Sequence, residues 1–186
     1  MNEILTGKLV RLAAFDPEEA GKAFSNWTRD SEYWRLMSSG AARLPSVREA
    51  TKFFEKDVEE MDTGIYAFGV RTLADDTLIG EMVLDVVDWS ARDAYVGLSI
   101  GDRANWGRGY GTEMMFLILR YAFMEVNLRR VSLAVFEYNP RAIRAYEKAG
   151  FRHEGRIRQL LNKEGRRWDM LIMGVLHEEW KEQYGN

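Results

Sequence analysis

A glycine-rich run at residues 105–112 constrains this chain more than any other segment. It has the sequence Asn-Trp-Gly-Arg-Gly-Tyr-Gly-Thr and lies between an alternating strand pattern and a long amphipathic helix pattern. Glycines at alternate positions let the backbone approach a ligand closely. The start of the following helix directs its unpaired N–H groups and the positive end of its dipole at the same place. The run therefore predicts a binding site for a pyrophosphate.

Two common phosphate-binding motifs do not fit this run. A P-loop requires Gly-Lys followed by Ser or Thr, whereas Gly109 is followed by Tyr110. A dinucleotide fingerprint requires Gly-x-Gly-x-x-Gly in an early strand-turn-helix unit. Here the spacing is Gly-x-Gly-x-Gly, and the run lies past the middle of the chain. Neither motif accounts for it.

A second motif at residues 137–151 has the sequence Glu-Tyr-Asn-Pro-Arg-Ala-Ile-Arg-Ala-Tyr-Glu-Lys-Ala-Gly-Phe. It predicts one short helix, because Asn139 can cap it, Pro140 suits its first position and Gly150 can end it. Asn139 and Tyr146 are two turns apart, so they share one face about 10 Å apart along the axis. Either residue alone is most simply a cap or a core aromatic. Together with the glycine run, they favour a functional role over a purely structural one.

The two motifs resemble the cofactor elements of the GNAT N-acetyltransferase superfamily. The glycine run is similar to the acetyl-CoA pyrophosphate loop of that family (Gln or Arg, two residues, Gly, one residue, Gly or Ala), with Trp106 where Gln or Arg is usual. The 137–151 segment resembles the second element, Asn, two residues, Ala, three residues, Tyr and then Gly-Phe. The end of the chain resembles the pattern of the RimJ/RimL-like and spermidine acetyltransferase branches, at Glu154-Gly155, Arg158, Gly165 and Asp169.

The resemblance implies acetyl-CoA as co-substrate and direct attack of a primary amine on its thioester. Such an attack needs a neutral amine, a polarised carbonyl and a stabilised leaving thiolate. Tyr146 matches the proton donor to the CoA sulfur. The cofactor would be held by the strand before the glycine run, by the run itself and by the helix cap: Leu98, Ser99, Ile100, Trp106, Gly107, Arg108, Gly109, Tyr110, Gly111, Thr112 and Asn139.

The general base is not evident, because both positions where related enzymes often carry Glu differ here. The strand motif Ala-Glu-x-Gly has Tyr95 in place of Glu, and Ala134 occupies the second position. The remaining candidates for the acceptor pocket are acids and aromatics: Glu32, Tyr33, Trp34, Glu81, Asp85, Tyr95 and Asp169. Solvent-facing acids and core aromatics are the competing interpretation.

The acceptor stays open among a protein N-terminus, a polyamine and another small amine. An α-amine has a pKa of about 7.7–8.0, against about 10.4 for a lysine-type amine, so it needs less base. This difference slightly favours a RimJ/RimL-like activity. The alternative is a non-catalytic acyl-CoA-binding sensor domain, which the two replaced Glu positions favour and the presence of Tyr146 disfavours.

Composition excludes several other classes. The chain has no cysteine, which removes disulfides, thiolate-metal sites and an acyl-cysteine intermediate, and its two histidines give little basis for a metal site. A net charge of -3 with dispersed basic residues argues against nucleic acid. The chain contains no stretch of roughly 18 apolar residues and no signal-like start, so we expect a cytoplasmic protein without a membrane partner. Exposed aromatics and the final hairpin could support a homodimer.

Periodicity and turn signals predict the order of elements. We expect strands at residues 8–14, 65–71, 78–87, 94–100, 131–136, 151–161 and 167–176, and helices at 17–27, 30–37, 46–61, 112–126 and after Asn139. A length of 186 residues with 46% hydrophobic content suits one domain, residues 1–186. The order matches the GNAT fold, an α/β (α+β) architecture. That fold has a mixed central sheet of about seven strands, splayed at the acetyl-CoA site, with flanking helices.

Overall fold

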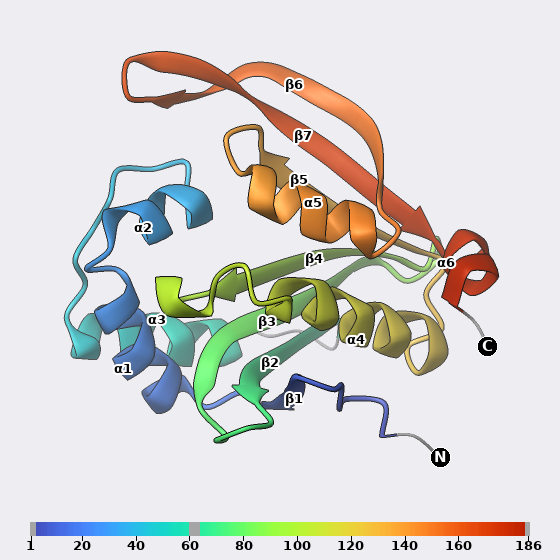
Figure 1. The fold of residues 1–186 in the computed structure, drawn as a ribbon, viewed down its shortest axis with the longest axis horizontal. Helices are drawn as coiled ribbons and strands as arrows, with labels where there is room; N and C mark the ends of the chain where they lie inside the picture. The colour runs from blue at the N-terminus through green and yellow to red at the C-terminus, as the bar shows by residue number, and fades with distance from the viewer. Residues whose placement is uncertain (1–2, 60–63, 185–186) are drawn as a thin grey trace.

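The computed structural model describes residues 3–59 and 64–184. Its centre is one seven-stranded sheet with the order β1-β2-β3-β4-β5-β7-β6 (Figure 1). The strands are β1 (Val10–Ala14), β2 (Ile65–Thr72), β3 (Leu78–Asp88), β4 (Asp93–Ile100), β5 (Arg130–Phe136), β6 (Arg152–Lys163) and β7 (Arg166–Leu176). Neighbouring strands are antiparallel except β4 and β5, which are parallel. The mixed sheet expected from the sequence is confirmed.

The helices are α1 (Pro17–Trp27), α2 (Ser31–Met37), α3 (Val47–Glu59), α4 (Tyr110–Met124), α5 (Pro140–Lys148) and α6 (His177–Tyr184), with one 3-10 turn, η1 (Arg103–Asn105). Helices α4 and α5 pack side by side over the sheet, and α1 packs against α3 (Figure 1). The α1–α3 crossing is close because it occurs at Gly21, where an added Cβ would lie 2.3 Å from Thr51 Oγ1.

Three predicted helix starts are confirmed by their caps. Asp16 accepts hydrogen bonds from the first turn of α1, and Asn139 Oδ1 accepts one from Ala142 N at 3.1 Å. Ser46 and Glu49 form a capping box at the start of α3: Ser46 N donates to Glu49 Oε2 at 2.8 Å and Glu49 N donates to Ser46 Oγ at 3.3 Å. The predicted end of this helix, near residue 61, lies outside the described residues.

Other boundaries differ from the prediction for identifiable reasons. Helix α4 begins two residues early, at Tyr110, because Gly109 itself serves as the N-cap with a φ of 89°. Strand β6 extends to Lys163, so the final hairpin turn narrows to Glu164 and Gly165, whose φ values of 54° and 70° suit a type I′ turn.

Helix α6 is an element that the sequence analysis did not predict. Strand β7 ends at Leu176 and the helix begins at the next residue, without a glycine or proline between them. Its stability comes from packing: Trp180 is 6% exposed and lies 5.5 Å from the ring centre of Phe123 on α4. One turn later, Tyr184 contacts Phe116 and donates a hydrogen bond to the Lys148 carbonyl.

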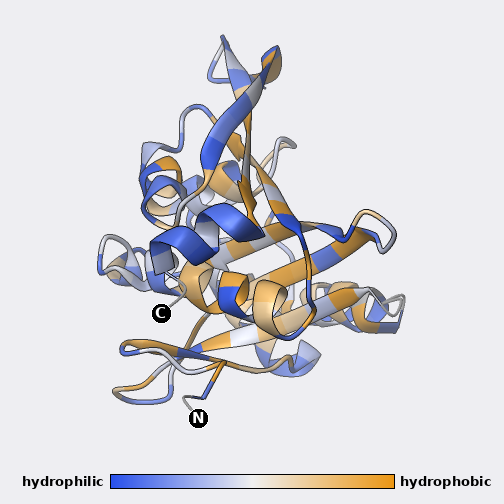
Figure 2. Ribbon diagram, turned by 90° about the vertical axis from the view of Figure 1, so that its right-hand side faces the viewer, coloured by the Kyte–Doolittle hydropathy of each residue, from blue (hydrophilic) through white to orange (hydrophobic). Residues whose placement is uncertain are grey.

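The core lies between the sheet and α4. Alternate residues of β3 are buried, and they join buried α4 side chains such as Met115 and Ile118 in one apolar cluster. Figure 2 shows hydrophobic residues gathered along the strands in the middle of the molecule. The β6–β7 hairpin protrudes at the top of the same view and carries mixed polar and apolar residues.

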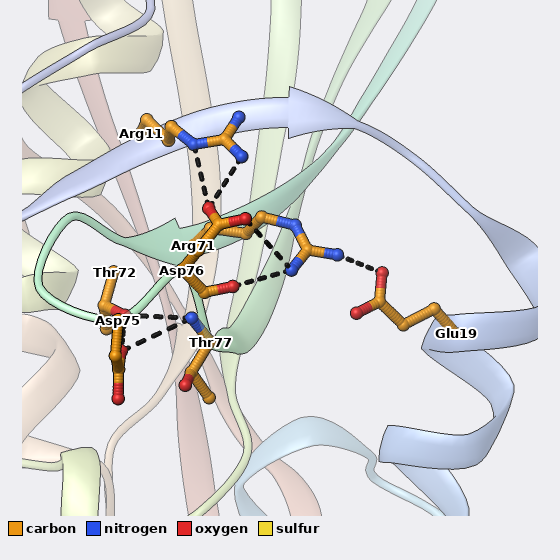
Figure 3. Close-up of polar contacts among 7 residues, drawn as sticks. All are labelled: Arg11, Glu19, Arg71, Thr72, Asp75, Asp76 and Thr77. Atoms are coloured by element: carbon orange, nitrogen blue, oxygen red, sulfur yellow. Dashed lines mark hydrogen bonds and ion pairs between the residues drawn. The ribbon is translucent and has the colours of Figure 1, made fainter.

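A polar cluster fixes the turn between β2 and β3 (Figure 3). Arg71 donates to the Asp76 carbonyl at 2.7 Å and pairs with Glu19 of α1, while Arg11 of β1 pairs with the Asp76 carboxylate at 2.7 Å. The neighbouring Asp75 accepts hydrogen bonds from two threonines, which hold the pKa of its carboxyl below the usual range. These contacts attach α1 to the edge of the sheet.

Candidate active site

Strands β4 and β5 separate halfway along their length. They pair only at Asp93–Arg130, Ala94–Val131 and Tyr95–Ser132. Beyond this point β4 continues along β3 to Ile100, and β5 continues along β7 to Phe136. The splay expected from the sequence is therefore confirmed. Residues 96–100 and 133–136 face an open wedge across which neither strand pairs with the other.

A cavity of about 630 Å³ occupies this wedge. It reaches both faces of the sheet: Leu98 and Ile100 pack against the core on the α4 side, whereas Ser99 points to the opposite face and contacts Tyr33 of α2. The predicted site residues that line the cavity are Tyr33, Glu81, Leu98, Ser99, Ile100, Trp106, Gly107, Gly109, Tyr110, Gly111, Thr112, Asn139 and Tyr146.

The glycine loop offers backbone donors to the cavity. Gly107 and Gly109 have φ values of 75° and 89°, a region that favours glycine. Gly109 provides no side-chain cap, so the first-turn N–H groups of α4 have neither a helical partner nor a capping side chain. The Trp106 N–H is not one of these donors, because it already donates to the Arg103 carbonyl at 2.9 Å.

Tyr146 faces the cavity from the second turn of α5. The residue is 9% exposed, and its hydroxyl has no hydrogen-bond partner among the residues that the structure describes. Burial raises the pKa of Tyr146 to about 12. The phenol is therefore protonated throughout the neutral range and is free to donate to a ligand.

Three polar side chains meet on the α2 side of the cavity. Tyr33 Oη donates to Ser99 Oγ at 3.2 Å, and Ser99 Oγ donates to Glu81 Oε1 at 3.5 Å. Tyr33 and Ser99 are 1% and 2% exposed, and Glu81 lies opposite Ser99 in the sheet register. Burial, and secondarily the nearby Glu81 carboxylate, raises the pKa of Tyr33. The arrangement places one carboxylate in the cavity wall on the α2 side.

The other predicted site residues do not line the cavity: Glu32, Trp34, Asp85, Tyr95, Arg108 and Asp169. Glu32 forms an ion pair with Arg103 at 2.7 Å. Asp169 pairs with Arg156 at 2.9 Å and accepts a hydrogen bond from Gln159 N at 2.8 Å, so it stabilises the irregular part of β6. A role for Arg108 in cofactor binding and roles for the other five residues in substrate binding stay predictions.

Three basic residues that the sequence analysis did not select also line the cavity. Arg141, Arg144 and Lys148 project from α5. Their separations of three and four residues place them on one helix face, and this spacing is the sequence signal that identifies them. They give the α5 side of the cavity a positive charge.

Two negative findings apply to residues 3–59 and 64–184. This part of the chain contains no group of three or more His, Cys, Asp or Glu side chains that could hold a metal ion. Within the same ranges, none of the helices has the length and apolar character needed to cross a membrane.

A splayed mixed sheet, with an open glycine loop at the start of the next helix, defines a class of proteins that bind an extended acyl carrier between two strands. The chain belongs to the GNAT acetyltransferase family, since the acetyltransferase (GNAT) domain matches residues 10–152. The SPbeta prophage-derived uncharacterized N-acetyltransferase YokL of Bacillus subtilis is 26% identical over 181 residues, which cover 97% of each chain. The probable N-acetyltransferase YjcK of the same organism is 33% identical over 134 residues, covering 72% of this chain and 70% of its own.

Solved structures share the fold. The spermidine N-acetyltransferase from Vibrio cholerae, solved in complex with CoA and spermine, superposes with a TM-score of 0.78 at 23% identity and covers 92% of this chain and 97% of its own. A GNAT-family acetyltransferase from Bacillus anthracis gives a TM-score of 0.76 at 21% identity, covering 94% and 98%.

The chain is thus an acetyltransferase, and acetyl-CoA is its co-substrate, as the sequence motifs predicted. The residues present fit this molecule. An added Cβ at Gly107 would meet no atom within 4 Å, so the loop presents bare backbone beside the cavity. The basic face of α5 offers charges that suit phosphates.

Proposed function

We propose that this protein transfers the acetyl group of acetyl-CoA directly to a primary amine. The observation that carries the proposal is the single cavity that joins the glycine loop and Tyr146, on the α4 and α5 side, to Glu81 on the α2 side. A cofactor and an acceptor entering from opposite faces of the sheet would meet between β4 and β5. No acyl-enzyme step is needed, because the chain has no cysteine to carry one.

Acetyl-CoA supplies the thioester carbonyl that the amine attacks. Backbone N–H groups of residues 107–112 hold its pyrophosphate at the start of α4. Tyr146 donates its hydroxyl hydrogen to the sulfur as the thiolate leaves. A phenol whose pKa burial raises to about 12 keeps that hydrogen at neutral pH.

Glu81 is the proposed proton acceptor for the attacking amine. It is the one carboxylate that lines the cavity within the described part of the chain. Ser99, which is buried and bonded to Tyr33, holds one oxygen of this carboxylate. Tyr33 and Ser99 are therefore positioning residues. Glu81 would serve as the base in place of the Glu residues that related enzymes often carry at the positions of Tyr95 and Ala134.

The acceptor in this proposal carries a single amino group, as a protein N-terminus or a small monoamine does. On the α2 side the cavity is lined by Tyr33, Leu36 and Met37, which suit an apolar substituent. The nearby Glu32 is already paired with Arg103, so it offers little charge for a second ammonium group. This lining favours a monoamine over a polyamine.

Thiol release from acetyl-CoA tests the proposal, measured against peptide N-termini, polyamines and aminoglycosides with Tyr146→Phe as the paired variant. We expect turnover on monoamine acceptors that collapses in Tyr146→Phe. CoA binding without turnover on any acceptor would instead support the acyl-CoA sensor.

Two finer expectations belong to this proposal. The homodimer and the cytoplasmic location expected from the sequence stay predictions. Light scattering after size-exclusion chromatography tests the first, because a mass near twice the 21.6 kDa of the chain would identify a dimer. Fractionation of cells that express the protein tests the second.

A further inference from the structure

Trp106, which stands where related sequences carry Gln or Arg, is held by three contacts. Its indole N–H donates to the Ile100 carbonyl at 2.8 Å, which attaches the ring to the end of β4. The guanidinium carbon of Arg141 on α5 lies 3.8 Å from the centre of the Trp106 ring, and that of Arg103 lies 5.5 Å away. The ring therefore links the glycine loop to the first turn of α5.

The two arginines at this ring differ in their partners. Arg103 pairs with Asp30 and Glu32, and its side chain is 54% exposed. Arg141 lines the cavity and stacks on the Trp106 ring, and within the described ranges it forms no ion pair and no side-chain hydrogen bond. Burial lowers the pKa of Arg141, and the charge of Glu32 offsets this effect only in part.

Arg141 also lies where positive charge from two elements converges. Arg144 and Lys148 line the same cavity from the same face of α5. The uncapped start of α4 approaches from the glycine loop, next in sequence to Trp106. Glu81, in contrast, lies on the other face of the sheet, beside Ser99 and Tyr33. An anion between the loop and α5 would meet donors from both sides.

We propose that Arg141, positioned by Trp106, binds the pyrophosphate of acetyl-CoA. It adds a guanidinium to a loop that carries Trp at position 106 where Gln or Arg is usual. The assignment rests on the proposed function and deepens it. The planar guanidinium can contact two phosphate oxygens at once, and stacking on the indole fixes the plane from which it does so. Trp106 is a positioning residue in this assignment, because it acts through Arg141.

Calorimetric titration with CoA and with dephospho-CoA, which lacks the 3′-phosphate but keeps the pyrophosphate, tests the assignment. We expect Arg141→Gln to weaken both ligands by about 10- to 100-fold, the usual effect of losing a charge-assisted contact. The dependence of affinity on salt should become shallower. Pantetheine, which has no phosphate, should bind both proteins equally in a chemical-shift titration. Arg48→Gln, an exposed α3 residue outside the cavity, is the matched control and should leave all three unchanged.

Trp106→Leu tests the positioning role. It should weaken CoA binding in the same direction, and its effect should add little to that of Arg141→Gln in the double variant, because both act through one contact. Arg141→Lys, which keeps the charge but not the planar fork, should give an intermediate loss. Fully additive losses in the double variant would remove Trp106 from the assignment.

Three results would overturn the proposal. These are unchanged CoA affinity in Arg141→Gln, an equal loss for pantetheine, and a loss for CoA that is absent for dephospho-CoA, which would assign Arg141 to the 3′-phosphate. Failure of the unmodified protein to bind CoA would instead contradict the proposed function itself. The two failures are therefore distinguishable.

Discussion

Tyr33 and Ser99, 66 residues apart in the chain, both line the cavity and are joined by a 3.2 Å hydrogen bond. Both side chains are buried, so the bond fixes α2 to β4 at the point where β4 has already separated from β5. Because Ser99 in turn donates to Glu81, the position of the proposed proton acceptor depends on Ser99 directly and on Tyr33 through Ser99. Four predictions test this arrangement and its surroundings.

Glu81→Gln should lower kcat/KM, and the loss should grow with the pKa of the acceptor amine. An amine that is mostly protonated at neutral pH needs the carboxylate more than one that is already neutral, and general-base catalysis is usually worth about 10²–10⁴-fold. A series of primary amines of increasing pKa, measured at one pH, gives the trend. Tyr33→Phe is the companion variant. It should lower the free energy of unfolding by about 1 kcal/mol, and its loss of activity should be much smaller than that of Glu81→Gln. A loss that is equal for every amine would contradict the base role.

Tyr146→Phe should lower kcat by about 10- to 10⁴-fold with a smaller effect on the Kd for acetyl-CoA, because the variant removes only the hydroxyl that donates to the leaving thiolate. Since burial raises the pKa of Tyr146 to about 12, the basic limb of the activity profile below that pH should not arise from this residue. Kinetics with calorimetry separates the two effects. Weaker acetyl-CoA binding with unchanged turnover would assign Tyr146 to binding instead.

Gly109→Ala and Gly111→Ala should have opposite effects on stability. Gly109 has a φ of 89°, so a Cβ there costs about 1–2 kcal/mol and shifts the loop that presents the N–H groups. Gly111 lies within α4 at an ordinary φ, where a Cβ would contact Ile100 at 3.5 Å, so alanine should stabilise the helix by about 0.5–1 kcal/mol. Urea unfolding and CoA titration check both. Equal destabilisation by the two variants would show that contacts of the added Cβ, and not the backbone φ, explain why glycine is needed at these positions.

Asp30→Asn should remove a stabilising contribution that depends on pH. Arg103 holds the pKa of the Asp30 carboxyl below its usual value, so the contribution is present above the unfolded value of about 3.9 and is lost as the pH falls through the lower folded value. For an exposed pair we expect a difference of about 0.2–1 kcal/mol at pH 7 that closes at low pH.

Asp30→Ala is the comparison for that measurement, because asparagine still caps α2 and alanine does not. Asp30 accepts a hydrogen bond from Glu32 N at 3.0 Å, and loss of such a cap costs about 0.5–2 kcal/mol at any pH. Urea unfolding at several pH values separates the two terms. If the difference in free energy of unfolding between Asp30→Asn and the wild type persisted at low pH, the charge contribution would be contradicted.

Much of the fold followed from local signals. The caps at Asp16, Ser46 and Asn139 act within four residues of chain, so the sequence predicts them directly. Alternating strands and the order of elements were equally local and are confirmed. Helix α6 was missed because no glycine or proline separates it from β7 and because Trp180 and Tyr184 pack against distant residues of α4 and α5. Its local cap, the hydrogen bond that the Leu176 N–H donates to Glu179, was overlooked.

The candidate site divides in the same way. The sequence by itself determined the glycine loop and the helix that carries Asn139 and Tyr146, because glycine conformations, caps and helical spacing are properties of short segments. Only the tertiary structure decided which distant side chains join them. Glu81 rather than Asp85 lines the cavity because β4 and β5 part after Tyr95, and Arg141 meets Trp106 because α5 packs beside the loop. These relationships depend on strand register and packing between elements, which no single segment encodes.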